Sequence, residues 1–120
     1  MKDSVLRLKT KQLAINIVKI TKTVKESKNE FVLSNQLLRS GTSVGANVHE
    51  ANYAQGVNDF ISKLEIALKE CYESEYWLDL LFETNYISES DYKSLITECG
   101  VIRKMLINSC KTVKENNNIL

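Results

Sequence analysis

The residues best suited to chemistry are polar side chains at helical spacing, Ser40, Ser43 and Asn47, with Glu50 one turn further on. Steps of three and four residues return to the same side of a helix, so these groups can share one edge. Such a row could line a pocket for a small ligand or supply the polar groups of an enzyme. It could instead be a buried network in which Arg39 pairs with an acid of a facing helix. The network is favoured because no nucleophile–base pair is visible, and the pocket of Ser43, Asn47 and Glu50 stays as the alternative.

Other familiar catalytic and metal sites are missing from the sequence. One histidine cannot build a histidine dyad or a multi-histidine metal site within a single chain. His49 and Glu50 begin a string similar to the HExxH zinc motif, but Tyr53 stands where the second zinc ligand is needed. No P-loop or GxGxxG string occurs. We therefore expect no catalytic residue, no metal and no cofactor.

The composition is that of one globular domain. A chain of 120 residues that is 43% hydrophobic can bury its own core, so we expect a single domain over residues 1–120. No apolar run approaches the ~20 residues that span a bilayer, and the N-terminal residues lack a signal-peptide pattern. Three cysteines cannot all pair within one chain, which favours reduced thiols and a cytoplasmic protein; they are Cys71, Cys99 and Cys110.

Apolar residues recur at alternating steps of four and three, which is the period of a helix. No alternation at the period of a strand is sustained. With no proline and only four glycines, nothing forces a break inside the long segments. We predict helices near residues 4–27, 30–55, 58–85 and 89–115. Their apolar stripes are Leu6, Leu13, Ile17, Ile20 and Val24; Leu37, Gly41, Val44, Val48 and Ala51; Ile61, Leu64, Leu68, Cys71, Leu78 and Phe82; and Tyr92, Leu95, Cys99, Ile102, Leu106 and Val113.

Short polar segments separate these stripes. Gly56 is placed like the residue that follows a helix, and Asn58 like the cap of the next one. Ser88 precedes the fourth stripe, with Asp91 three residues later in a variant of the capping box. Long helices joined by short loops predict an all-α, antiparallel, up-down-up-down four-helix bundle.

Two features of the predicted helices call for particular neighbours. Gly41 and Gly45 lie inside the second helix, where each costs about 1 kcal/mol relative to alanine. We expect close approach of a neighbouring helix to offset that cost. Glu75 falls within the core stripe of the third helix, so it requires a cation such as Arg39 or Arg103.

A second set of apolar residues lies on the sides of the helices that a monomer would turn to water. Spaced at about 100° per residue, the set falls opposite the core stripes of the first and third helices. An aligned second stripe on a surface helix suggests a partner surface. We expect these faces to meet between subunits of a homo-oligomer, with Trp77 packed under a loop of its own chain as the alternative. The set is Leu8, Ile15, Ile66, Trp77 and Leu80.

The net charge of +1 conceals an uneven distribution. Residues 1–40 carry nine Lys or Arg against three Asp or Glu, and residues 41–91 carry two against ten. Either the basic and acidic helices lie side by side, or the basic face is free for an anionic partner such as nucleic acid. Lys11, Lys22 and Lys25 are the candidate contacts, because they share the outer side of the first helix. No aromatic residue is interleaved with them, which predicts weak electrostatic binding without base recognition.

Residues 37–51, followed by residues 59–70 and 75–78, resemble the bacterial four-helix-bundle proteins first met as open reading frames in intervening sequences of 23S ribosomal RNA genes. The motif that carries the resemblance is Arg39, Ser43, Asn47 and Glu50. The resemblance implies a bundle that assembles into a ring, typically a pentamer. It also implies similarity to the accessory protein of diversity-generating retroelements, a basic nucleic-acid-binding pentamer. It implies no catalytic residues.

We therefore predict a non-enzymatic homo-oligomeric interaction or scaffold protein with weak, non-specific nucleic-acid binding as a further property. The alternative is a small-ligand-binding protein or an enzyme that uses Ser43, Asn47 and Glu50.

Overall fold

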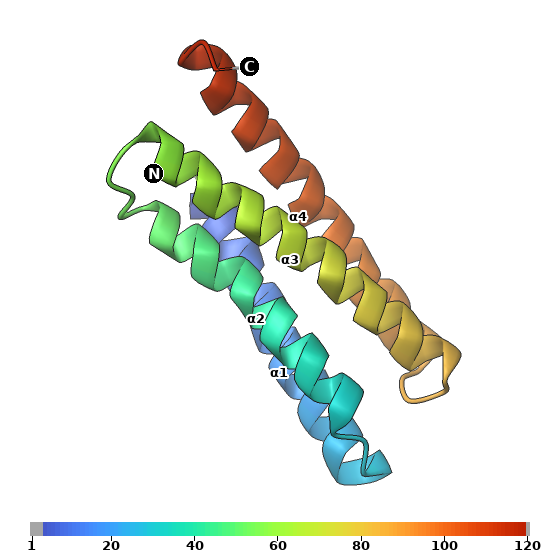
Figure 1. Cartoon of the computed structure of the whole chain (residues 1–120). Helices are drawn as coiled ribbons and strands as arrows, with labels where there is room; N and C mark the ends of the chain where they lie inside the picture. Colours follow the sequence, from blue (N-terminus) through green and yellow to red (C-terminus); the bar gives the residue numbers. More distant parts are fainter. Residues whose placement is uncertain (1–3, 120) are drawn as a thin grey trace.

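The computed structural model describes residues 4–119, and these residues form four helices. The helices are α1 (Ser4–Lys28), α2 (Val32–Ala51), α3 (Val57–Glu83) and α4 (Glu89–Asn116). Consecutive helices run in opposite directions, and the bundle measures 49 × 21 × 21 Å (Figure 1). No strand occurs within residues 4–119. The predicted all-α, antiparallel, up-down-up-down bundle is confirmed.

Asparagines end three of the helices. Asn29, Asn85 and Asn118 follow α1, α3 and α4 in the left-handed conformation, at φ 54°, 68° and 55°. Asparagine tolerates this conformation better than most residues do, and it is the usual stop after glycine. The prediction that Gly56 ends a helix and Asn58 caps the next is wrong. Gly56 itself precedes α3 with an extended backbone, φ 167°.

Two acceptor side chains at helix N-termini fix where α2 and α4 begin. Ser88 caps α4 by accepting from the Asp91 amide at 3.0 Å, as predicted. Glu30 accepts from the backbone amides of Leu33 at 2.9 Å and Ser34 at 2.8 Å, so α2 begins at Val32 and not at residue 30. Burial would raise the pKa of Glu30, but these hydrogen bonds, together with one from the Ser34 hydroxyl, hold it below the ordinary value.

Glu30→Ala is expected to lower the free energy of unfolding by about 1 kcal/mol at neutral pH, because two helix amides lose their acceptor. The lowered pKa means that this contribution is present above the ordinary glutamate pKa and is lost as pH falls through the folded-state pKa. Urea denaturation of both proteins along an acid series should therefore show the difference shrinking. Glu26→Ala, an exposed glutamate near the end of α1, is the control and should change little. A Glu30 effect independent of pH would contradict this account.

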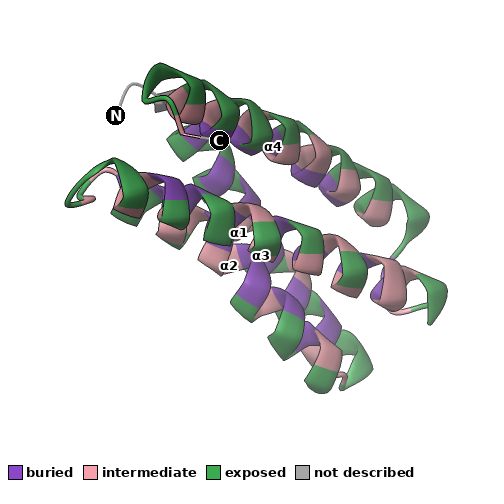
Figure 2. Ribbon diagram, turned by 45° about the horizontal axis from the view of Figure 1, so that its top comes forward, coloured by how far each residue is buried: buried purple, intermediate pink, exposed green. Residues whose placement is uncertain are grey.

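The core is a single cluster drawn from all four helices. Figure 2 shows the buried segments on the sides of the helices that face one another. Most residues of the predicted stripes are buried. A few are half-buried at the edge of the core, among them Ile20, Leu68 and Phe82. The largest fully buried side chains include Leu6, Leu13, Ile17, Leu37, Leu64, Leu78, Leu81, Ile102 and Leu106.

The two interior glycines of α2 face α1. A Cβ atom on Gly41 would lie 2.2 Å from Cδ1 and 3.0 Å from Cγ2 of Ile17. A Cβ atom on Gly45 would lie 3.2 Å from the backbone oxygen of Thr10. The predicted close approach is confirmed, and α1 is the helix that makes it.

The order of packing separates the most basic helix from the most acidic one. α1 and α3 each pack against α2 and α4 and not against each other, so they lie diagonally across the bundle. The contact between α1 and α4 is the smallest of the four. α1 and α3 therefore do not lie side by side, so the first explanation of the charge asymmetry is wrong for α1. It holds for α4, whose Arg103 and Lys114 pair with Glu75 and Glu65 of α3.

Candidate functional site

The polar row on α2 joins that helix to α3. Arg39 contacts Glu70, at 3.1 Å, and Glu73. At the other end of the row Glu50 pairs with Lys63 at 2.9 Å. The predicted pairing of Arg39 with an acid of the third helix is confirmed.

The middle of the row bonds to its own helix. The Ser43 hydroxyl donates to the Arg39 carbonyl oxygen at 2.7 Å, and the Asn47 amide donates to the Ser43 carbonyl oxygen at 2.9 Å. Arg39 and Glu50 are both about half exposed, so their ion pairs contribute little stability. The two ends of the row therefore bond to a facing helix as the network interpretation requires, but the predicted burial is wrong, because Arg39 and Glu50 are exposed and Ser43 and Asn47 are half-buried.

A buried hydroxyl pair gives Ser40 the bond to a facing helix that the row requires, although its partner Ser74 was not predicted from the sequence. Ser74 of α3 donates to the Ser40 hydroxyl of α2 at 2.9 Å, and both side chains are fully buried. A signal was present, because Ser74 interrupts the apolar stripe between Cys71 and Leu78. The pair lets α2 and α3 approach closely without an unsatisfied polar group.

Glu75 has the partner that its position required. Arg103 of α4 donates to its carboxylate at 2.9 Å, and the Arg103 guanidinium also lies 5.6 Å from the ring centre of Tyr72. The charge in the core stripe is thus explained by an ion pair between helices.

The cysteines are buried hydrophobic residues in this structure. The Cys71 thiol donates to the Cys99 carbonyl oxygen at 3.4 Å. The contact with Cys71 and burial raise the pKa of the Cys99 thiol, and burial raises that of Cys110. Raised thiol pKa values make these groups poor nucleophiles. Within residues 4–119 no cluster of three or more His, Cys, Asp or Glu side chains could hold a metal ion.

The outer apolar faces are only partly as predicted. Leu8 and Ile15 on α1 are 68% and 39% exposed, and Ile66 on α3 is 38% exposed. Trp77 is half-buried, packs against the core, and donates its indole N–H to Glu73 at 2.9 Å. Leu80 is half-buried as well. The expectation that Trp77 and Leu80 turn outward is therefore corrected, because the arc of α3 covered by its two neighbours is wider than one stripe.

The cations of α1 have no acidic partner in the part of the chain that the structure describes. The helix carries seven Lys or Arg and one Glu, and none of its cations takes part in an ion pair within residues 4–119. Lys11 and Lys22 are exposed, and Lys25 is half-buried. By contrast, Arg39, Arg103 and Lys114 neutralise acids of α3.

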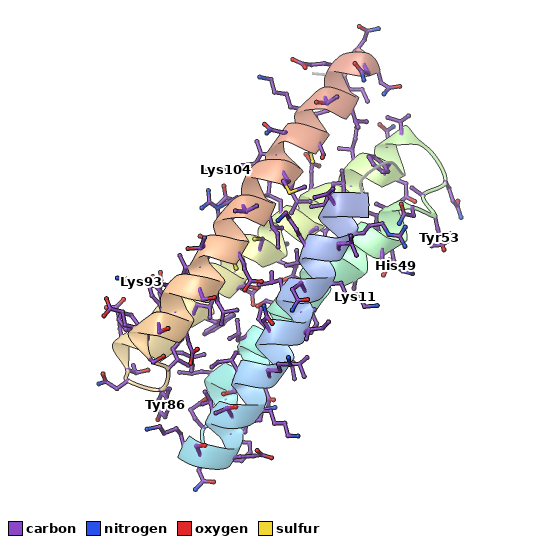
Figure 3. The ribbon with its side chains drawn as sticks, turned by 180° about the vertical axis from the view of Figure 1, so that it is seen from behind. Lys11, His49, Tyr53, Tyr86, Lys93 and Lys104 are labelled. Carbon is purple, nitrogen blue, oxygen red and sulfur yellow. The ribbon has the colours of Figure 1, made fainter. Side chains whose placement is uncertain are left out.

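A groove runs between the first half of α1 and the second half of α2. Its volume is about 690 Å³. Arg7, Leu8 and Lys11 line it from α1, and Gly45 and His49 line it from α2. Figure 3 shows Lys11, His49 and Tyr53 on the same side of the molecule, toward the same end. Sequence reasoning missed this juxtaposition, because it depends on the antiparallel pairing of α1 with α2.

Within residues 4–119 no helix is both apolar enough and long enough to cross a membrane. The fold and surface define a small four-helix-bundle protein with a polar network between α2 and α3 and a basic helix whose cations form no ion pair among the described residues. The chain belongs to the family described as 23S rRNA-intervening sequence protein, whose model matches residues 2–108. The family that residues 37–51 predicted is thereby confirmed.

A solved structure is similar over nearly the whole chain. It is a protein with unknown function from the S23 ribosomal protein family of Bacteroides thetaiotaomicron VPI-5482, 49% identical, with a TM-score of 0.90. The match covers 92% of this chain and 99% of that chain. No curated protein matches the chain.

Proposed function

We propose that this protein is a non-enzymatic interaction protein that assembles into a ring of identical subunits, the pentamer implied by the sequence resemblance. The observation that carries the proposal is that exposed apolar side chains remain on two helices that lie diagonally across the bundle, Leu8 and Ile15 on α1 and Ile66 on α3. Two different faces that meet make a head-to-tail contact, and such contacts close into rings when the rotation permits. The buried thiols suit a reducing compartment, so the proposal places the protein in the cytoplasm.

Charge is the second argument for this contact. α1 carries seven Lys or Arg against one Glu, whereas α3 carries seven Asp or Glu against two Lys. Opposite net charge on the two helices would orient an encounter, but Glu65, Glu70 and Glu73 already contact cations of their own chain, so charge adds little to the affinity of this contact. The apolar side chains would then supply most of the binding free energy.

Glutamate substitutions on each face provide the test. Leu8→Glu on α1 and Ile66→Glu on α3 are each expected to give monomers of 13.7 kDa, because each places a charge in the contact. Mixing the two variants should restore one intact contact and give a one-to-one dimer but no larger species. Analytical ultracentrifugation measures both results. Val32→Glu, at a residue that is 72% exposed but lies on neither face, is the control and should leave the oligomer intact.

Two outcomes would contradict the ring. The unmodified protein could sediment as a monomer at micromolar concentration, which removes the oligomer altogether. Alternatively, the mixed variants could form the full assembly, which would show that these faces are not the two halves of one contact.

Nucleic-acid binding is the second candidate function, and the unpaired cations of α1 favour it. Phosphates require only Lys or Arg, and binding releases counterions, so affinity should fall steeply with salt. We expect Lys11→Glu, Lys22→Glu and Lys25→Glu together to abolish a gel shift seen at ~50 mM salt and lost by ~200 mM salt. The control reverses Lys69, Lys104 and Lys111, which are exposed on α3 and α4, and changes the net charge equally.

If the two triple substitutions weakened the gel shift equally, nucleic acid would be attracted to the overall charge of the protein and not to a face on α1. The absence of a shift at the lowest salt with an intact oligomer would remove nucleic acid as a partner and leave the scaffold proposal standing.

A further inference from the structure

We propose that the groove between α1 and α2 binds single-stranded nucleic acid, with Arg7 and Lys11 contacting phosphate and His49 and Tyr53 contacting a base. The inference rests on the second candidate function and gives it a location. It also departs from the sequence-based expectation of purely electrostatic binding, because the fold brings aromatic rings to the cations.

The groove has the size and lining of a binding site for a nucleotide unit. Its volume of about 690 Å³ lies within the range of roughly 300–1,000 Å³ that small-ligand sites occupy. Leu8 and Ala14 from α1 and Gly45 and Ala46 from α2 supply apolar or small surface.

Charge at the groove is positive and is not neutralised by the described residues. Arg7 and Lys11 line the groove, and neither forms an ion pair within residues 4–119. Lys22 lies three turns further along α1, about 16 Å from Lys11 by the rise of a helix. An extended phosphate backbone can follow such a line of cations.

Aromatic rings stand at the α2 side of the groove. His49 lines it, and the Tyr53 ring centre lies 5.5 Å from that of His49 at an interplanar angle of 56°. Tyr53 is 74% exposed, so its face is free to stack (Figure 3). Stacking requires a base that is not already stacked in a duplex, which selects a single strand.

A second copy of the chain contacts the rim of the groove in the proposed ring, through Leu8, but it is the less favoured occupant of the groove itself. The acids of α3 that would complement Arg7 and Lys11 are already engaged, since Glu70 and Glu73 contact Arg39 and Glu65 contacts Lys114. Protein carboxylates would also leave the aromatic pair without a partner. A nucleic acid supplies both partners, a phosphate for the cations and a base for the aromatic rings.

Fluorescence anisotropy on the full chain can test the groove with a labelled RNA of about 12 nucleotides and with the same strand in a duplex. At ~50 mM salt we expect the single strand to bind more tightly than the duplex. Tyr53→Ala should weaken single-strand binding roughly 5- to 100-fold without changing the salt dependence. Tyr76→Ala is the matched control, because Tyr76 is 58% exposed on α3, and it should have no effect.

Lys11→Ala should weaken binding and reduce the salt slope by about 0.7, the value for one phosphate contact on a single strand. Lys104→Ala, at an exposed lysine of α4, is its control. Equal binding of duplex and single strand, or equal effects of Tyr53→Ala and Tyr76→Ala, would overturn the groove and leave non-specific binding standing. Binding of neither RNA at the lowest salt would overturn both. Loss of self-association by Tyr53→Ala with RNA binding unchanged would assign the groove to a second copy and also overturn the inference.

Discussion

Replacing Gly41 with alanine is expected to destabilise the bundle, although alanine normally favours a helix by about 1 kcal/mol. The added Cβ atom would lie 2.2 Å from Cδ1 of Ile17, which is fully buried and cannot swing into solvent. Overpacking of this kind costs roughly 1–3 kcal/mol, and leucine at the same position should reach or exceed the upper end. Urea denaturation followed by circular dichroism measures the loss.

A double-mutant cycle can assign that loss to the contact itself. Ile17→Val removes the Cδ1 atom and alone should cost about 0.5–1.5 kcal/mol. In the Gly41→Ala background the same change relieves the clash, so it should cost less or become stabilising. Gly56→Ala is the control, because no atom lies within 4 Å of the added Cβ, and it should fall within about 0.5 kcal/mol. Strict additivity in the cycle would contradict close packing of α1 against α2.

Trp77→Ala is expected to lower the free energy of unfolding by about 3 kcal/mol, the lower end for deleting a large aromatic side chain. The indole ring packs against the core, and its centre lies 5.0 Å from the centre of the Tyr76 ring in an edge-to-face arrangement. The indole N–H donates to Glu73. Tyr76→Ala removes an aromatic ring that is 58% exposed and should cost less than about 1 kcal/mol. All variants should be compared at one protein concentration, because self-association adds to apparent stability.

Trp77→Phe separates packing from hydrogen bonding. It keeps most of the apolar surface but removes the N–H donor, so it should cost about 1 kcal/mol. The indole of Trp77 and the guanidinium of Arg39 hold the pKa of Glu73 below its usual range, and the variant should raise it. If Trp77→Ala dissociated the oligomer and left unfolding unchanged, Trp77 would belong to the subunit contact instead.

The sequence predicts the helices well because the stripes of Leu, Ile and Val keep the helical period without proline. It predicts the bounds of the second helix less well, because that helix was expected over residues 30–55 and spans Val32–Ala51. The ends of α1 and α3 lie within one and two residues of the predicted positions. Trp77 shows a different limit. A single helix viewed alone has one buried stripe, whereas α3 contacts two neighbours and buries a broader arc.

The polar row on α2 could be predicted from the sequence, whereas the groove between α1 and α2 could not. The ion pairs from Arg39 to α3 were predictable, because an arginine beside a core stripe needs an acidic partner and α3 carries several acidic residues. The meeting of Lys11 with His49 was not, because it joins the start of one helix to the end of the next. Only the antiparallel pairing of α1 with α2 brings these residues to the same end.

The small contact between α1 and α4 has a consequence for how the bundle moves. α2 and α3 each have large contacts on both sides, whereas α1 and α4 each have one large contact and one small one. Separating α1 from α4 therefore breaks fewer interactions than any other opening of the bundle. Local unfolding begins where the fewest buried contacts are lost, so we expect backbone amides of α1 and α4 to exchange with solvent through openings that leave the α2–α3 pair closed. The helix that carries the unpaired cations is thus also one of the two that the fold holds least firmly.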